Sequence, residues 1–480
     1  MKKLISLSIL LFSIFSFAQE NDNLSIGFES NSQYYVDDEK TGDFTDPDRF
    51  RSNNYLKIDY TFNNFYVGAQ IEGYEPMALL NFSPNLDKTN LGLYYAGFKN
   101  EKVDITAGHF FEQFGSGLIL RSWEDRQLGL NNALRGGRIK YNLSKDVQLT
   151  ALYGQQRYGF KYSEGDIYGF NADIDMSSLL KMENAALNFG FSYVGRNETV
   201  EDKKGFDFKD LTNAFSTRLD WSKGNFYTNA EYVSKSKDAI IIFDDIRNAK
   251  PGNAFLLNFG YAKSGLGVDA TFRRMENMTF SSDRFAVGNQ YNENIVNFTP
   301  ALTKQHDYLL TNIYVYQAQP KVSFQDASLI KAGEIGGQLD LFYKFKKGSS
   351  LGGKYGTKIA INASYWAGLG GNYDFNNFDY ETDFLGFGEK YFSDISLEEC
   401  QNEIEKTDQI IDQLYQQAGV KRGQKMFRFP YGDKGDLRYG LVFRNTMKYN
   451  KTRHEAIQKM LSDLDYAQPS YRGINYRFMD

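Results

Sequence analysis

The chain is poor in the residues that most often build disulfides and metal sites. It contains one cysteine, Cys400, so it can form neither an internal disulfide nor a cysteine-based metal cluster. It contains three histidines, His109, His306 and His454, and none of them are spaced as a pair of metal ligands. We therefore expect no metal and no cofactor.

Long apolar runs and a strong charge bias are also missing. After the N-terminal residues, no stretch approaches the roughly 18 consecutive apolar residues of a membrane-spanning helix. A helical membrane protein is thereby excluded, and a chain that lies in a membrane must cross it with closed β-structure. The 55 basic and 60 acidic residues give a net charge of −5, which gives no reason to expect a nucleic-acid partner.

The N-terminus has the pattern of a secretory signal peptide. Lys2 and Lys3 form a basic region, residues 4–15 form an apolar region, and Ser16-Phe17-Ala18 places small residues before a cleavage site. We expect cleavage after Ala18, so that residues 1–18 are removed and the mature protein is exported. No cysteine follows the apolar region, which excludes a lipoprotein anchor.

Aromatic residues and glycine, by contrast, are abundant. The chain has 34 Tyr, 40 Phe and 43 Gly, yet its mean hydropathy is −0.52. A chain rich in rings but polar on average is expected when apolar and polar faces alternate along many strands. Together with the export signal, this favours an antiparallel transmembrane β-barrel over a soluble β protein, and we assign residues 19–390 to that barrel.

The clearest alternation lies in residues 55–72. Apolar side chains occupy every second position from 56 to 62 and from 65 to 71, and Asn63-Asn64 suits a two-residue turn between them because Asn tolerates positive φ. The same pattern predicts hairpins of 139–143 with 147–153, 215–221 with 226–233, and 255–262 with 266–272, and strands at 335–345 and 358–366.

Short turns alternate along the chain with longer polar stretches, such as 198–210 and 280–297. Outer-membrane barrels show this asymmetry between periplasmic turns and extracellular loops, and the chain offers roughly a dozen strands. We therefore expect a protein of the outer membrane, whose partners are the membrane lipid and the barrel-assembly machinery. A structural surface barrel with no transport role stays open as a further interpretation.

Residues 109–133 combine glycine with dense charge, beginning His-Phe-Phe-Glu-Gln-Phe-Gly-Ser-Gly-Leu. Over about residues 24–392 the chain resembles an uncharacterised family of Gram-negative outer-membrane barrel proteins, for which no substrate is assigned. Two interpretations stay open for this stretch: a constriction or plug in the lumen, where charge is tolerated, and an ordered loop whose basic and acidic residues pair with each other. The lumen candidates are Glu112, Arg121, Glu124, Asp125 and Arg126.

Residues 241–245 read as a strand that ends in two carboxylates, a frequent metal site in hydrolases. The few histidines are not placed to complete such a site. We interpret Asp244 and Asp245 as polar residues of a loop.

The sequence pattern changes between about Gly388 and Ser396. The residues Ser396-Leu397-Glu398-Glu399 match a helix capping box, apolar residues follow at helical spacing, and a second capping box begins at Thr452. No further barrel strand is evident after Phe392, so the sequence leaves closure of the barrel open.

Between these expected helices lies Phe427-Arg428-Phe429-Pro430-Tyr431-Gly432. Residues 391–480 thereby resemble a truncated segment of the polysaccharide deacetylase (NodB-homology) family, a small α/β fragment of that family's barrel. The resemblance implies that Arg428 orients a catalytic aspartate, that the Tyr431 amide holds an oxyanion, and that Pro430 and Gly432 shape the groove. An intact member hydrolyses N-acetyl sugars with a Zn²⁺-bound water.

The metal-binding triad of that family, an Asp and a His-x₃-His motif, is absent from this chain. We therefore expect no deacetylase activity, although a carbohydrate remains a candidate ligand. An outer-membrane barrel that binds or passes an unknown solute is the favoured function, and a carbohydrate deacetylase is the alternative. The change of pattern also suggests that the chain joins parts of two genes.

Overall fold

The computed structural model describes residues 23–401, except 38–44, 47, 80–84, 87, 127–128, 243, 287–293, 300–331 and 354–355. The expected signal peptide, residues 1–18, and the segment 402–480 lie outside the described residues. Both assignments therefore stay predictions.

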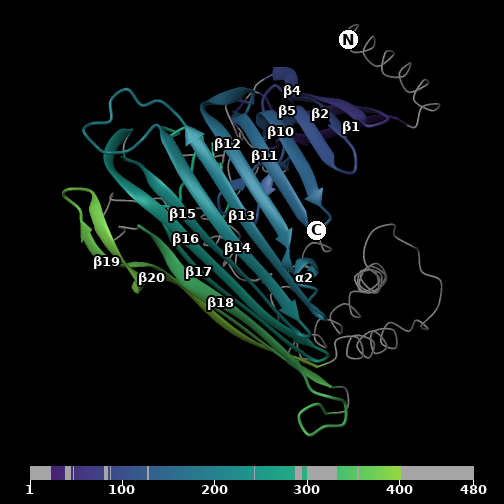
Figure 1. Ribbon diagram of the computed structural model, residues 1–480, viewed down its shortest axis with the longest axis vertical. Coiled ribbons are helices and arrows are strands. Elements are labelled where there is room, and N and C mark those ends of the chain that lie inside the picture. Colours follow the sequence, from purple (N-terminus) through teal and green to yellow (C-terminus); the bar gives the residue numbers. More distant parts are fainter. Residues whose placement is uncertain are drawn as a thin grey trace.

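Sixteen strands form one antiparallel sheet, in which each strand pairs with its neighbours in the chain (Figure 1). This confirms the mainly β fold, and the expectation of about a dozen strands was too low. The sheet order is β1 (Leu24–Tyr34), β2 (Phe50–Phe62), β3 (Phe65–Glu75), β4 (Lys88–Lys99), β5 (Val103–Phe110), β10 (Leu134–Ser144), β11 (Val147–Tyr158), β12 (Lys161–Asp175), β13 (Ala185–Asn197), β14 (Leu211–Lys223), β15 (Phe226–Ile242), β16 (Asp245–Lys263), β17 (Leu266–Glu276), β18 (Gly333–Lys344), β19 (Thr357–Asp374) and β20 (Asp379–Gln401).

Four two-residue strands interrupt this order between β5 and β10. They are β6 (Gln113–Phe114), β7 (Leu120–Arg121), β8 (Glu124–Asp125) and β9 (Leu130–Asn131), and they pair as β6–β7 and β8–β9. The short helix α2 (Met176–Leu179) follows β12 and is capped by the Asp175 side chain. Within the described residues, no helix is long and apolar enough to cross a membrane.

The predicted hairpins are present with tight turns. Phe62 pairs with Phe65 across Asn63-Asn64, and Asn63 adopts the positive φ that this turn requires. The turns after β14 and β16 contain Gly224 and Gly265, which also have positive φ. These turns lie at one end of the sheet, whereas most of the longer connections lie at the other.

One face of the sheet, the outer face, is apolar. Its large side chains are exposed, for example Leu219 at 44% and Phe259 at 42%. Such exposure of alternating apolar residues on many neighbouring strands suits a lipid environment rather than water. Register places the following residues on this face, none of them charged: Leu149, Ala151 and Tyr153 on β11, Phe189, Phe191 and Tyr193 on β13, Phe215, Leu219 and Trp221 on β14, Ala230 and Tyr232 on β15, and Leu257 and Phe259 on β16.

Aromatic pairs on the outer face lie near both ends of the strands. Phe65 contacts Phe98 beside the short turns, at a ring-centroid distance of 5.1 Å. Tyr153 contacts Tyr168, at 5.3 Å, toward the opposite ends of β11 and β12. Outer-membrane barrels carry aromatic girdles at both membrane interfaces in this way.

The structure corrects the expected break between Gly388 and Ser396. Strand β20 runs through it without interruption, and Ser396 pairs with Asn362 of β19. The capping-box pattern at Ser396–Glu399 is a local preference, and pairing with the neighbouring strand overrides it. Residues 391–401 therefore belong to the sheet and do not begin a helix at Ser396, whereas the domain boundary near residue 391 stays a prediction.

The sheet is not closed in this structure. Strands β1 and β20 form its two edges, and within the described residues they do not pair with each other.

Because the outer face is apolar, we expect a new charge to lower the stability much more on the outer face than on the opposite face, the inner face. Leu219→Arg places a charge amid the apolar band, and we expect it to lower the free energy of unfolding by about 2–4 kcal/mol. Gln148→Arg, on the inner face at β11, is the control and should change the free energy of unfolding much less. Guanidinium titration of the protein refolded into lipid vesicles measures both, and equal losses would contradict a lipid-facing outer face.

Candidate functional site

Two segments between strands lie against the other face of the sheet, the inner face. These inward segments are residues 111–133, between β5 and β10, and the described part of 277–299, between β17 and β18. They are hydrogen-bonded to each other: Arg121 donates its backbone N–H to Val296, at 2.8 Å, and Phe298 donates to Gly117, at 2.9 Å. The two segments therefore form one unit.

The inward segments are packed onto an apolar patch of the inner face, the apolar seat. Leu118, Ile119 and Leu120 are at most 1% exposed and belong to one buried cluster with the seat. Contact of this kind excludes water. The seat consists of Leu152, Ile167, Val194, Ala214, Val233, Ala254, Leu256 and Met275.

The predicted lumen residues mostly bond to the strands rather than to each other. Glu112 accepts from Lys140, at 2.8 Å, and from Arg138, at 3.4 Å, both on β10. This contact ties the start of the first inward segment to the sheet.

Glu124 and Arg126 tie the middle of the same segment to β1 and β3. Glu124 accepts from Gln70, at 3.0 Å, and Arg126 pairs with Glu29 and donates to Gln70, at 3.0 Å. The pair Arg126–Glu124, at 3.6 Å, lies within the segment. The Arg126 guanidinium also lies 4.4 Å from the centre of the Tyr55 ring.

The guanidinium of Arg121 contacts two aromatic rings. It lies 4.6 Å from the Trp123 ring and 4.0 Å from the Phe298 ring. Burial lowers the pKa of Arg121 from its ordinary value, because desolvation disfavours the charged form. Asp125, the last of the predicted lumen residues, lies in β8 opposite Leu130.

Behind Glu124 and Arg126 lies a buried ion pair that joins two distant strands. Arg157 on β11 donates twice to Glu72 on β3, at 2.9 and 2.6 Å, and both side chains are 1% exposed. Gln70 and Tyr74 also donate to Glu72. A buried pair of this kind must be fully hydrogen-bonded to be tolerated, and Glu72 meets that condition.

The second inward segment is anchored by another buried network. Arg284 donates to Asp238, at 2.8 Å, and pairs with Glu198, at 3.3 Å, while Arg196 donates to both oxygens of Asp238, at 2.7 Å. Burial raises the pKa of the neighbouring Asp283 carboxyl, and backbone N–H groups of Gly165 and Glu164 oppose that shift.

Arg218 lies where the first inward segment meets the short-turn side of the inner face. It pairs with Asp173, at 2.9 Å, and a side chain at Gly115 or at Gly190 would collide with it, since an added Cβ would lie 2.2 or 2.4 Å from its atoms. These two glycines therefore leave the room that the Arg218 side chain fills.

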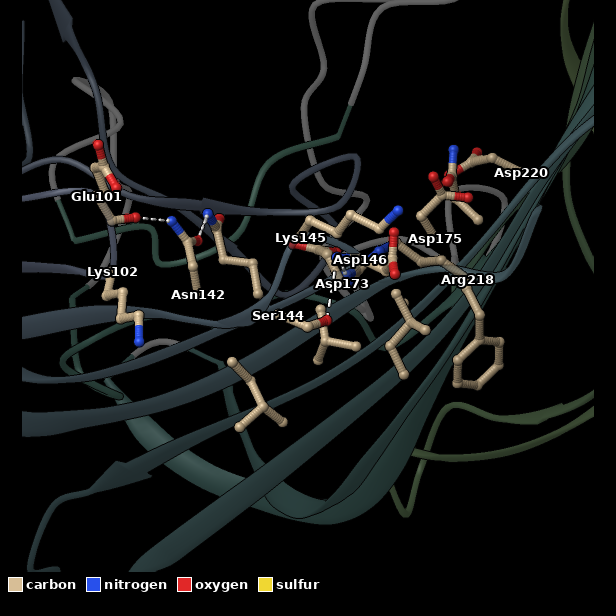
Figure 2. Close-up of a pocket in the computed structure, with 17 residues that line it drawn as sticks. Glu101, Lys102, Asn142, Ser144, Lys145, Asp146, Asp173, Asp175, Arg218 and Asp220 are labelled. Atoms are coloured by element: carbon tan, nitrogen blue, oxygen red, sulfur yellow. Dashed lines mark hydrogen bonds and ion pairs between the residues drawn. The ribbon is translucent and has the colours of Figure 1, made fainter. Parts of the chain in front are cut away.

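A pocket of about 600 Å³, the vestibule, lies at the short-turn end of β10–β14 (Figure 2). Figure 2 shows Glu101, Lys102 and Asn142 along one side and Arg218 and Asp220 along the other. Its volume is within the range of small-molecule sites, but its polar lining differs from their usual apolar one. The charged lining residues are Glu101, Asp146, Asp173, Asp175, Asp220, Lys102, Lys145 and Arg218.

The lining of the vestibule offers charged and hydrogen-bonding side chains. Among the described residues, no group of three or more His, Cys, Asp or Glu side chains is arranged to hold a metal. The predicted deacetylase residues Arg428, Pro430, Tyr431 and Gly432 lie outside the described residues. Asp244 lies in the turn between β15 and β16, as expected of a loop residue, whereas Asp245 is the first residue of β16.

Sequence reasoning missed the second inward segment and both buried networks. A signal for them existed: Glu72 and Arg196 stand within strongly alternating strands, where a charge on the face opposite the aromatic residues must point inward. The partner of each charge comes from a strand or segment more than 40 residues away in the chain, which alternation alone does not reveal.

Comparison with protein families gives one match over most of the chain: a family of unknown function, DUF6029, over residues 1–428. The chain belongs to this family. The DUF6029 match runs past residue 391, where we had expected a deacetylase-like segment to begin. No curated protein matches the chain.

Solved structures with a similar arrangement of strands are bacterial outer-membrane proteins. OccK8 (OprE) of Pseudomonas aeruginosa is 12% identical, over 72% of this chain and 84% of that chain, with a TM-score of 0.37. OmpT, an outer membrane protein of Vibrio cholerae, is 11% identical over 76% and 93%, with a TM-score of 0.30. The outer membrane protein OprD of P. aeruginosa is 11% identical over 72% and 87%, with a TM-score of 0.29.

The Arg157–Glu72 pair is buried and the Arg126–Glu29 pair is partly exposed, so we expect their removal to cost different amounts of stability. Arg157→Met leaves Glu72 buried and unpaired, and we expect it to lower the free energy of unfolding by about 3–5 kcal/mol. Arg126→Met removes a more exposed pair and should cost at most about 1 kcal/mol. Guanidinium titration in vesicles compares them. Adding Glu72→Gln to Arg157→Met should restore part of the loss, and no recovery would show that packing, not charge, is what Arg157 supplies.

Proposed function

We propose that this protein is an outer-membrane β-barrel whose inner face binds or passes a polar solute, and that the inward segments narrow its lumen. Its outer face supports the membrane location, since the apolar positions of many neighbouring strands are exposed and uncharged. In the membrane its partners are the outer-membrane lipid and the assembly machinery that inserts barrels.

The observation that carries the solute role is the division of the inner face into two parts. The apolar seat is sealed by the inward segments, whereas the vestibule next to it is open and polar. A barrel with a purely structural role would not need an open polar pocket that ends at a packed constriction. The division is expected if a hydrophilic solute enters the lumen and its passage is restricted.

No observation favours the deacetylase alternative. Residues 391–401 belong to the sheet, and the family match continues across 391–428.

A variant that loosens the constriction tests the proposal. Ile119 is fully buried against the apolar seat, so Ile119→Asp places a charge in a dry contact and should displace the segment. We expect a larger unitary conductance in planar lipid bilayers than for the unchanged protein. Gln113→Asp adds the same charge to the same segment at an exposed position and is the matched control.

Two results would contradict the proposal. A folded Ile119→Asp protein with unchanged conductance would show that the segment does not restrict the lumen. The absence of any conductance in both proteins, after heat-modifiable migration on gels has shown that they are folded, would favour the purely structural barrel.

A further inference from the structure

A single row of polar side chains crosses six neighbouring strands of the inner face. Its members are direct partners in the strand register, from β13 to β18. None of them carries a positive charge, and one carries a negative charge. The polar row is Asn188, Asp220, Asn229, Asn258, Thr271 and Gln338.

The row joins the two parts of the inner face already described. Its first members, Asn188 and Asp220, line the vestibule. Asn258 follows Leu256 of the apolar seat by two positions on β16, so the row runs along the border of the seat that faces the short turns. A solute that enters the vestibule therefore meets the row before it meets the constriction.

The row has accessible donors and acceptors. Asn188 and Asp220 are exposed and have no hydrogen-bond partner among the described residues. Thr271 donates to the side-chain oxygen of Asn258, at 2.6 Å, and Asn258 donates to Asn229, so these three hold each other in place. Amides and hydroxyls offer both donors and acceptors without a net charge, which suits ligands rich in hydroxyl groups.

Two exposed aromatic rings lie on the same face, on the short-turn side of the row. Tyr227 is 38% exposed and Phe342 is 42% exposed. Each ring covers a glycine on the neighbouring strand: an added Cβ at Gly260 would lie 1.9 Å from the Tyr227 ring, and one at Gly267 would lie 2.1 Å from the Phe342 ring. The rings are therefore laid across the sheet. The Tyr227 hydroxyl donates to Asp269, and the Lys358 ammonium lies 5.4 Å from the centre of the Phe342 ring.

Flat aromatic faces beside amide and carboxylate groups are the combination that recognises sugars, because a sugar ring has an apolar face and a rim of hydroxyls. A charged solute would instead need fixed charges of one sign, whereas the charges beside the row and the rings are of both signs. Asp269 and Asp340 accept from Tyr227 and Gln338, Lys358 lies over the Phe342 ring, and Arg218 is paired with Asp173.

We propose that the polar row and the rings of Tyr227 and Phe342 form a binding track for a neutral oligosaccharide. The proposal rests on the proposed function, in that it names the class of polar solute that the lumen takes. It makes Asn258 and Phe342 specificity-determining residues.

Isothermal titration of the purified full chain in detergent tests the track independently of conductance. Maltotriose and chitotriose are the neutral probes, and the tripeptides of lysine and of glutamate are charged probes of similar size. We expect binding of at least one trisaccharide and of neither tripeptide. Asn258→Ala and Phe342→Ala should each weaken trisaccharide binding roughly fivefold, as expected for the loss of one hydrogen bond or one ring contact.

Asn376→Ala is the matched control, because it removes an exposed amide from the turn between β19 and β20, away from the row. Its affinity should equal that of the unchanged protein. Phe342 is exposed, so its removal leaves the fold intact and keeps the test valid if Asn258→Ala does not fold.

Binding of neither trisaccharide, or equal affinities in Phe342→Ala and the control, would overturn the track. Trisaccharide binding without conductance would keep the track and overturn passage through the lumen, whereas conductance without trisaccharide binding would do the reverse.

Discussion

The constraint on which the structure depends is the pairing of backbone N–H and C=O groups between neighbouring strands of the sixteen-stranded antiparallel sheet. In an apolar environment these groups have no other partners, so the strands must pair throughout and their side chains must alternate between two faces. The outer face takes most of the large apolar side chains, and most charged and amide side chains of the strands lie on the inner face. Asp166 and Asn213 lie on the outer face and accept from the hydroxyls of Tyr153 and Tyr193. The composition of the lumen is therefore a consequence of the outer surface.

That consequence explains why the inward segments are so firmly held. Charges such as Arg157 and Arg196 on the inner face are buried and must find partners, and they do so on other strands and on the segments themselves. The apolar seat has the opposite need, since residues such as Val194 and Ala254 would face water if the segments were absent. Ion pairs and apolar contacts thus fix the same segments at different points.

The sequence predicts the parts of this structure that depend on local order. The strands and the Asn63-Asn64 turn at 55–72 can be predicted because the alternation within each strand shows which side chains lie on which face. The strand through Ser396 is not visible, because its residues also fit a helix start and the deciding contact, with Asn362, lies more than 30 residues away. The same reason hides the partner of Glu112, whose importance the sequence indicates but whose contacts with Arg138 and Lys140 depend on how residues 109–133 turn inward.

The difference between the two kinds of contact also bears on how a solute passes. Lifting the segments from the apolar seat would expose several buried side chains, each at a cost of roughly 1.5–3 kcal/mol, so the segments will not leave the seat as a unit. The contact between Arg126 and Glu29 is partly exposed, with side-chain exposures of 26% and 46%, and such pairs contribute little stability. Any widening of the lumen that leaves the fold intact should therefore begin on the side of β1, where the first inward segment is attached by the polar contacts of Glu124 and Arg126 and by the contact of Arg126 with the Tyr55 ring.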